Sequence, residues 1–248
     1  MAIQFDNTNT SSVTLRPGTA ADAIVVGGAS SNAVSSQWGA ILGGNGNTAN
    51  ASQSAIVIGG SSNLASGNLS VAIGGQSNTT NSSNSIVSGG YGITRSIIGN
   101  AVFSPHDGAV SFSNGNSQSA ILIVGRQTTD ATPTVLRCDG SSPGTTNQVI
   151  LPNNSAYYFC GSIVCGVTGA GNSSAWTFEG LIKRGANAAS TVIVQSVVNL
   201  VGQNTGASTW VAAISADTTN GGLAVTVTGQ ASTTIRWVCK IETTEMTY

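Results

Sequence analysis

The sequence predicts an all-β protein that consists of a repetitive shaft followed by a compact tip. Short apolar runs ending in a glycine pair recur at a regular spacing in the first half, and strand-like runs separated by turn residues fill the second half. Asp, Glu, Lys and Arg make up only 7% of the 248 residues, against roughly 25% in an average globular protein. Neutral side chains must therefore provide most of the surface polarity.

The repeat begins near residue 23. The second glycine of each pair stands at positions 28, 44, 60, 75 and 90, so the period is 15 or 16 residues. The aliphatic run suits a short strand, and Gly-Gly suits a bend with positive φ. The asparagine that follows the pair tolerates the left-handed region and caps its own turn. Each period thus predicts strand, turn, second strand and turn, and successive periods should stack into a β-solenoid. The asparagines are Asn32, Asn47, Asn63 and Asn78.

The apolar face of this repeat is too large for one thin coil to enclose. No charged residue occurs over the 72 positions between Asp22 and Arg95. Three parallel chains around an axis would bury the Ile and Val side chains in a shared core and leave Ser, Thr and Asn outside. We therefore predict a homotrimer with a β-roll shaft. Its expected core residues are Ile24, Ile41, Ile56, Ile58, Ile73 and Ile86.

The segments 54–67 and 70–75 carry a family resemblance. Their pattern, Ser-Ala-Ile-Val-Ile-Gly-Gly-Ser-Ser-Asn and Ser-Val-Ala-Ile-Gly-Gly, resembles the head repeats of trimeric autotransporter adhesins. This resemblance implies a trimeric left-handed β-roll over roughly residues 23 to 100. The chain departs from the family because it shows neither a secretory signal nor a membrane-anchoring C-terminal barrel. It also has no apolar run of the roughly 20 residues that a membrane helix needs, so we expect no export by that route and no membrane insertion.

Residues 1–22 are expected to attach the chain to a larger particle. The segment 3–17 resembles the N-terminal segments of phage tail-fibre and virion-fibre proteins. That resemblance implies docking on a tail adaptor or capsid protein, and a plain N-terminal cap of the solenoid is the alternative. The expected attachment residues are Phe5, Val13, Leu15 and Arg16.

The second half predicts an antiparallel β-sandwich, jelly-roll-like, over residues 127–248. Residues 101–126 keep an alternating apolar pattern and are assigned to the end of the shaft, which spans 23–126; residues 128–133 break that pattern. Beyond them, turn residues separate eight strand-like runs. The stretch 210–242 resembles the C-terminal β-domains of phage fibre proteins. The eight runs are 134–138, 148–151, 156–167, 175–183, 191–201, 209–216, 223–227 and 234–242.

Little in the sequence points to catalysis or to a metal. The single histidine, His106, stands beside Asp107 in a turn and is better explained by solvation than by a catalytic dyad. Cys160 and Cys165 lack a second Cys or His pair, and all four cysteines are predicted to be reduced, buried apolar residues. We expect no metal and no cofactor. A net charge of −1 also argues against nucleic acid as a partner.

A surface that binds a glycan is the remaining chemical role. Aromatic rings stack on sugars and neutral amides bond to hydroxyls, although packing in the core or capping of turns explains the same residues. The expected binding residues are Tyr157, Tyr158, Trp176, Trp210, Asn172, Asn204 and Asn220.

Together these observations predict a non-catalytic structural subunit of a phage virion, of the tail-fibre or tailspike type. It would be made in the host cytoplasm, lie on the tail or capsid surface, and recognise a bacterial surface glycan or protein during adsorption. One alternative is a capsid head fibre or decoration protein with a structural role alone. Another is a polysaccharide depolymerase with a site between subunits.

Overall fold

The chain forms two compact units in a computed structural model that describes residues 15–17, 24–27, 31–105, 110–111, 113–169 and 171–248. The first unit, called the roll, comprises Met1–Thr94 and Phe103–Asn114. The second, called the tip, comprises Arg95–Val102 and Gly115–Tyr248. With 53% strand and 3% helix, the protein is all-β, as predicted.

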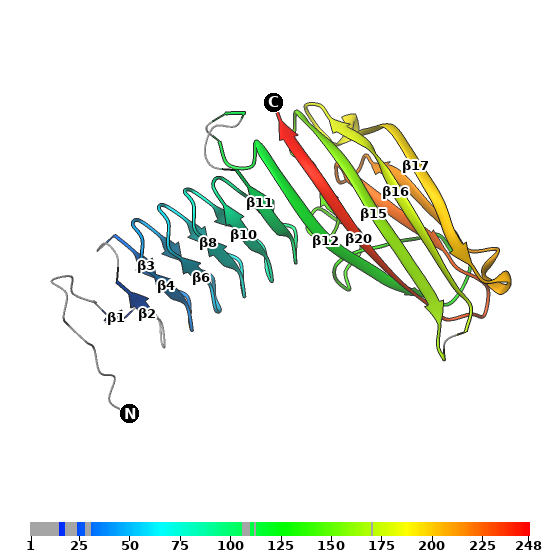
Figure 1. Ribbon diagram of the computed structural model, residues 1–248, viewed down its shortest axis with the longest axis horizontal. Helices are drawn as coiled ribbons and strands as arrows, with labels where there is room; N and C mark the ends of the chain where they lie inside the picture. Colours follow the sequence, from blue (N-terminus) through cyan, green and yellow to red (C-terminus); the bar gives the residue numbers. More distant parts are fainter. Residues whose placement is uncertain (1–14, 18–23, 28–30, 106–109, 112, 170) are drawn as a thin grey trace. The chain divides into compact units, whose positions relative to one another are not determined.

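The roll is a β-solenoid of about five turns, with two short parallel sheets (Figure 1). Each period supplies one strand to each sheet, which confirms the predicted order of strand, turn, strand and turn. The longer strands, joined in a parallel ladder, are β2 (Ile24–Val26), β4 (Ala40–Leu42), β6 (Ile56–Ile58), β8 (Val71–Ile73) and β10 (Ile86–Gly89). The shorter ones are β3 (Ala33–Val34), β5 (Thr48–Ala49), β7 (Leu64–Ala65) and β9 (Thr79–Thr80). At the start of the chain β1 (Leu15–Pro17) pairs antiparallel with β2.

The middle residue of each longer strand points into the roll. Because side chains alternate along a strand, this position is fully enclosed within the chain, while the residues on either side of it face outward. Ile41 is 0% exposed and belongs to this interior, so its assignment to a core shared between chains is wrong. In the strand Ala40–Leu42 the isoleucine is the middle residue, whereas in Ile56–Ile58 the isoleucines are the first and last residues. Ile41 therefore faces the side of the sheet opposite to that of Ile56 and Ile58. The inward residues are Val25, Ile41, Val57, Ala72 and Val87.

A ladder of buried asparagines holds one corner of the roll. The Nδ2 of Asn47 donates to the carbonyls of Gly43, Gly59 and Gly60, each at 3.2 Å, so it bonds both its own turn and that of the next coil. The φ angles of Gly44, Gly60 and Gly75 are positive, and a Cβ on Gly60 would collide with the carbonyl oxygen of Gly75. Close approach of the coils therefore requires glycine there.

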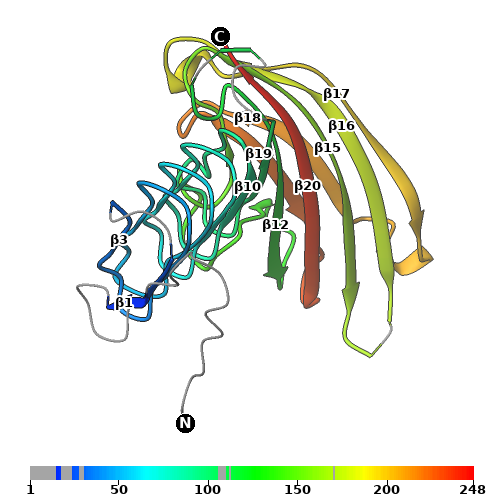
Figure 2. The same ribbon diagram turned by 60° about the vertical axis from the view of Figure 1, so that its left-hand side comes forward.

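The tip is a sandwich of two antiparallel sheets around one core (Figure 1). The larger sheet is curved (Figure 2). Its order is β12 (Ser117–Thr128), β20 (Ile235–Thr247), β15 (Ser155–Val167), β16 (Ser173–Arg184) and β17 (Val192–Gln203). The smaller sheet holds β13 (Thr134–Val135), β14 (Val149–Ile150), β18 (Val211–Asp217) and β19 (Gly222–Thr228). The remaining elements are β11 (Ala101–Ser104) and the 3₁₀ turns η1 (Ala188–Ser190) and η2 (Thr205–Ala207).

The boundary between the units differs from the predicted one near residues 126–133. β12 was assigned to the end of the shaft, yet all twelve of its residues pair antiparallel with β20, from Ser117 opposite Met246 to Thr128 opposite Ile235. Its inward residues, including Leu122 and Val124, belong to the tip core. An alternating apolar pattern marks a half-buried strand but does not reveal whether its partner is near or distant in the sequence.

Three tryptophans pack together in the tip core. The rings of Trp176 and Trp237 are stacked at 5.9 Å between centroids, and Trp210 lies 5.9 Å from Trp237 in a tilted arrangement. The indole N–H groups of Trp237 and Trp210 donate to Thr128 and Gln230, respectively. Buried indoles normally find such a partner.

All four cysteines are free thiols, as predicted. Burial raises the pKa of Cys165 and of Cys239 to about 12. Cys138 and Cys160 are only partly buried, so the prediction that all four would be core residues is wrong for these two. Cys160 lies at an outward position of β15, and Cys138 lies beyond the end of β13.

Candidate interaction surfaces of the roll and the tip

The outward face of the longer sheet in the roll is apolar, and its side chains are exposed or of intermediate burial within the described part of the chain. The strands pair in parallel without a shift, so equivalent outward positions stack into two columns. Ile24, Leu42 and Ile58 are 40%, 47% and 40% exposed. One column contains Ile24, Ala40, Ile56, Val71 and Ile86, and the other contains Val26, Leu42, Ile58 and Ile73.

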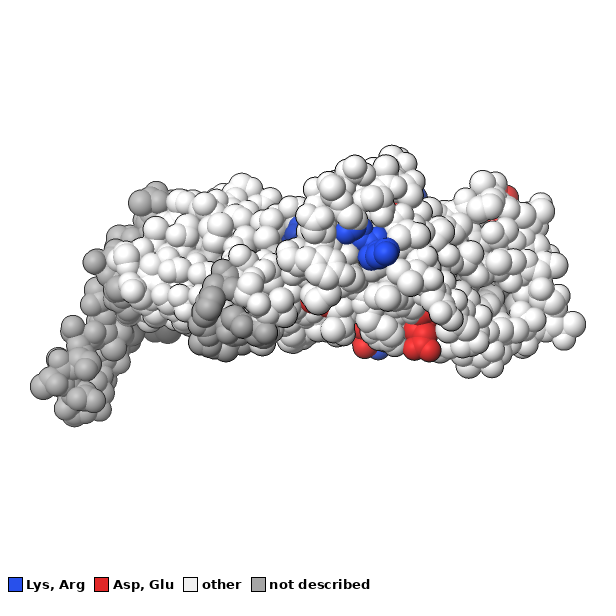
Figure 3. Space-filling view, turned by 90° about the horizontal axis from the view of Figure 1, so that it is seen from above, with Lys and Arg blue, Asp and Glu red and all other residues white. Residues whose placement is uncertain are grey.

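Of the six isoleucines expected in a core between chains, five lie in these columns. Only Ile41 faces the interior of its own roll. No charged residue lies at positions 23–94, and the described part of the roll is white on the face seen in Figure 3, with Lys, Arg, Asp and Glu appearing over the tip. The two columns thus form an apolar surface without charged side chains.

The larger sheet of the tip has an outer face, defined as the side chains that alternate with those of the core. Many of its members are apolar and exposed, up to 58% for Val164. Soluble monomers rarely expose contiguous apolar patches larger than a few hundred Å². The large apolar residues on this face are Ile123, Tyr158, Val164, Leu181, Val192, Val197, Val238 and Met246.

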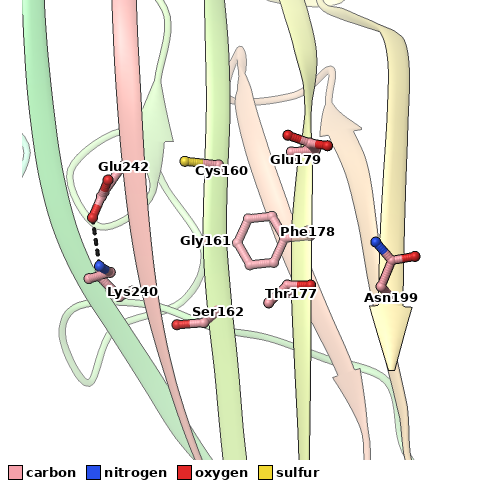
Figure 4. A pocket seen from close by; sticks show the side chains of 9 residues that line it. All are labelled: Cys160, Gly161, Ser162, Thr177, Phe178, Glu179, Asn199, Lys240 and Glu242. Atoms are coloured by element: carbon pink, nitrogen blue, oxygen red, sulfur yellow. Dashed lines mark hydrogen bonds and ion pairs between the residues drawn. The ribbon is translucent and has the colours of Figure 1, made fainter. Parts of the chain in front are cut away.

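A polar hollow of about 400 Å³ lies in the middle of this outer face (Figure 4). Two adjacent rows of cross-strand neighbours form it, since pairs directly opposite on one face lie about 5 Å apart. One row runs across β20, β15, β16 and β17 as Lys240, Ser162, Thr177 and Asn199. The next row runs across the same strands as Glu242, Cys160, Glu179 and Val197. The short side chains of Cys160, Ser162 and Thr177 leave the space empty.

Charges of both signs line this hollow. The Lys240 ammonium lies 2.6 Å from Oε1 of Glu242, and this contact raises the pKa of Lys240 above its ordinary value. On the β16 side the Tyr158 hydroxyl donates to Oε2 of Glu179 at 2.8 Å. That hydrogen bond is the main reason why the pKa of Tyr158 rises to about 12. One ammonium and two carboxylates therefore meet in the middle of this face.

A second, smaller hollow of about 210 Å³ borders the first and shares Glu179 with it. It is lined by Tyr158, Glu179, Gly180, Leu181, Gln195, Ser196 and Val197.

Three of the four aromatic residues predicted to bind glycan are core residues. Tyr157 is 0% exposed, Trp176 6% and Trp210 4%, so none presents a ring face to a ligand. Tyr158 alone lies outward, at 44% exposure, beside the hollows. Tyr157 and Tyr158 are consecutive in a strand, so one of them must face the core and the other must face out.

The three predicted asparagines lie in turns of the tip. Nδ2 of Asn220 donates to Oδ2 of Asp217 at 2.7 Å, and Oδ1 of Asn204 accepts from the backbone N–H of Ser173 at 2.8 Å. The backbone carbonyl of Asn172 accepts from the N–H of Val167. For Asn204 and Asn220, these bonds give the side chain a role within the fold.

Other predicted residues fall partly outside the described chain. Phe5, Val13, His106 and Asp107 lie outside the described residues, and Leu15 and Arg16 belong to β1. Among the residues that the structure describes, no group of three His, Cys, Asp or Glu is placed to hold a metal ion. Likewise, no helix within the described ranges is long and apolar enough to span a membrane.

No family model and no curated protein matches the sequence. Among solved structures, the tailspike protein of Acinetobacter phage vB_ApiP_P1 is 12% identical, with a TM-score of 0.20, and the alignment covers 90% of this chain and 54% of that one. The tailspike protein of Acinetobacter baumannii phage AM24 is 9% identical, with a TM-score of 0.24, and the alignment covers 83% of this chain and 49% of that one. This chain spans about half the length of these two tailspike proteins.

Proposed function

We propose that the protein is a homotrimeric, non-catalytic subunit of a fibre or spike on a phage virion. In this assignment residues 1–22 attach to the tail or capsid, the roll is a stiff spacer, and the tip meets a bacterial surface glycan or protein. The single observation that supports it best is the pair of apolar columns on the outward face of the roll.

Burial of these columns between copies accounts for their composition. A fully buried Val, Ile or Leu side chain contributes about 1.5–3 kcal/mol relative to its exposed state, so nine apolar residues per chain supply a substantial driving force. Parallel chains around a threefold axis would bring equivalent residues to the same height. The absence of charge on this face fits that arrangement, because an unpaired charge near the axis would be costly.

The phage assignment is supported by the resemblance of residues 3–17 and 210–242 to segments of phage fibre proteins. Competition for host cells tests it: purified protein added before infection should slow adsorption of the phage that encodes it. A matched sample in which Ile58→Asp prevents assembly should compete weakly. Equal adsorption with and without the purified protein would contradict a host-recognition role and favour a structural subunit of the virion.

A further inference from the structure

The outer face of the larger tip sheet combines two properties that one chain leaves unexplained. Eight large apolar side chains are exposed on it, and a hollow containing three charged groups lies among them. Both properties belong to strands of the sheet, so the surface is built on rigid elements. The face lies within the tip.

We propose that a second copy of this chain covers this outer face and that its side chains fill the hollow lined by Lys240, Glu179 and Glu242. The proposal rests on the proposed homotrimer, and it adds an interface in the tip to the one in the roll. Each chain would present its own face to a neighbour and receive a neighbour in turn.

The hollow holds one ammonium and two carboxylates, so the ammonium of one copy can pair with a carboxylate of another copy. Oε2 of Glu179 accepts from the neutral hydroxyl of Tyr158, and no ion pair of Glu179 is found among the described residues. The side chain of Lys240 is 49% exposed and lies beside that of Glu242 at the hollow (Figure 4). A copy that supplies an ammonium to Glu179 therefore completes the site, and charge pairs of this kind set the register between surfaces.

The surroundings of the hollow favour a protein as its occupant over a saccharide. Sugar rings are bound by stacking on aromatic faces, and the strands of this face offer one exposed aromatic ring, Tyr158, against seven aliphatic or Met side chains. Large exposed apolar patches mark surfaces that bind another protein. A saccharide remains an outcome of the test below.

The thiol of Cys160 provides a direct probe, because it lines the hollow while Cys165 and Cys239 are buried in the core. The experiment follows labelling of Cys160 by a maleimide in the native full-length protein, with peptide mass spectrometry to separate it from Cys138. If a neighbour covers the hollow, Val164→Glu should speed labelling of Cys160 by about tenfold or more over the wild type, because access controls the reaction of a thiol. A carboxylate added on the same strand would by itself slow the reaction of the Cys160 thiol with the maleimide. Faster labelling therefore indicates that the thiol has become more accessible.

Val211→Glu is the matched control. Val211 is 50% exposed and lies on β18 of the smaller sheet, whereas Val164 is 58% exposed on β15. The control should leave labelling of Cys160 at the slow rate of the wild type. Both variants replace an exposed valine, so the fold of the single chain should tolerate each.

The possible results separate the two proposals. A trimer in which Cys160 is labelled as fast in the wild type as in Val164→Glu would overturn the tip interface and leave the homotrimer standing. Fast labelling that slows when host polysaccharide is added would overturn it in favour of a saccharide site. A monomeric wild-type protein would overturn the homotrimer itself, and the tip interface with it.

Discussion

The backbone N–H of Asn63 donates to the side-chain Oδ1 of Asn47 at 3.0 Å, and one coil further on Asn78 repeats this bond to Asn63 at 2.9 Å. These bonds stay in register although the period changes from 16 to 15 residues between the two steps. The extra residue of the 16-residue period must therefore lie elsewhere in the coil. The asparagine corner keeps the same hydrogen bond in both periods.

Replacing Asn63 tests the ladder. Its Nδ2 donates to the carbonyls of Gly59, Gly74 and Gly75, and Asn63→Asp would set a carboxylate against them. Since an unsatisfied buried polar group costs about 1–3 kcal/mol, we expect a loss of at least about 3 kcal/mol of unfolding free energy. Thermal or denaturant unfolding measures it. Asn50→Asp, at an exposed position of the preceding coil, should change little.

The two glycines of one pair should differ sharply in their tolerance of alanine. At Gly59 an added Cβ meets only the carbonyl oxygen of Leu42, at an ordinary contact distance of 4.0 Å, and the cost is that of a positive φ, about 1–2 kcal/mol. At Gly60 the same φ cost is joined by a collision with the backbone of the next coil and with Asn63. Gly60→Ala should therefore unfold at a clearly lower temperature than Gly59→Ala, and equal effects would show that the coils are less closely packed.

The buried ion pair of the tip offers a third test. Nε of Arg95 lies 3.1 Å from Oε2 of Glu245, which also accepts from Gln118 at 2.7 Å. Removing one partner of a buried pair typically costs 3–5 kcal/mol, so we expect Glu245→Ala to lose about that much, measured by denaturant unfolding. Asp130→Asn removes a fully exposed carboxylate and should leave the unfolding midpoint close to that of the wild type.

Asp217 gives a prediction for pH dependence. Partial burial alone would raise the pKa of this carboxyl, but hydrogen bonds from Asn220, Gln148 and Thr219 hold it below its ordinary value of 3.8. A carboxyl with a depressed pKa stabilises the fold above its unfolded value, and this contribution is lost as pH falls through the folded value. Asp217→Asn should therefore lower the unfolding midpoint at pH 7. The difference from wild type should shrink from about pH 4 downward, and a gap that stays constant to pH 2 would contradict the prediction.

Much of the fold could be predicted from the sequence because its signals are local. The glycine pairs and asparagines predicted the coil, and the apolar run 156–167 lies within β15, Ser155–Val167. The partner of β12 could not be predicted, since β20 lies more than a hundred residues away along the chain. Local patterns carry no information on such pairings.

The candidate surfaces were predictable in part. Isoleucines at both ends of Ile56–Ile58 indicate an outward apolar face once the middle residue faces inward. The hollow in the tip was missed, because Glu179 and Lys240 become neighbours only through the order of strands in the sheet. The charged residues themselves were a signal for this hollow. Charged side chains are rare in this chain, and Glu179, Lys240 and Glu242 stand at alternating positions of predicted strands.

The Ile58→Asp variant tests the shared core of the roll directly. Ile58 is exposed within the chain, so the change should leave the single-chain fold intact while setting three carboxylates close to the axis of a trimer. We expect species smaller than a trimer, measured by analytical ultracentrifugation. Leu69→Asp, at a turn position with 54% exposure, should remain trimeric.

The mass of the wild-type protein in solution tests the central claim most directly. Size-exclusion chromatography with multi-angle light scattering should give three times the chain mass of 24.7 kDa over a range of dilutions. A monodisperse species of 24.7 kDa would contradict the account, because the apolar columns of the roll would then face water.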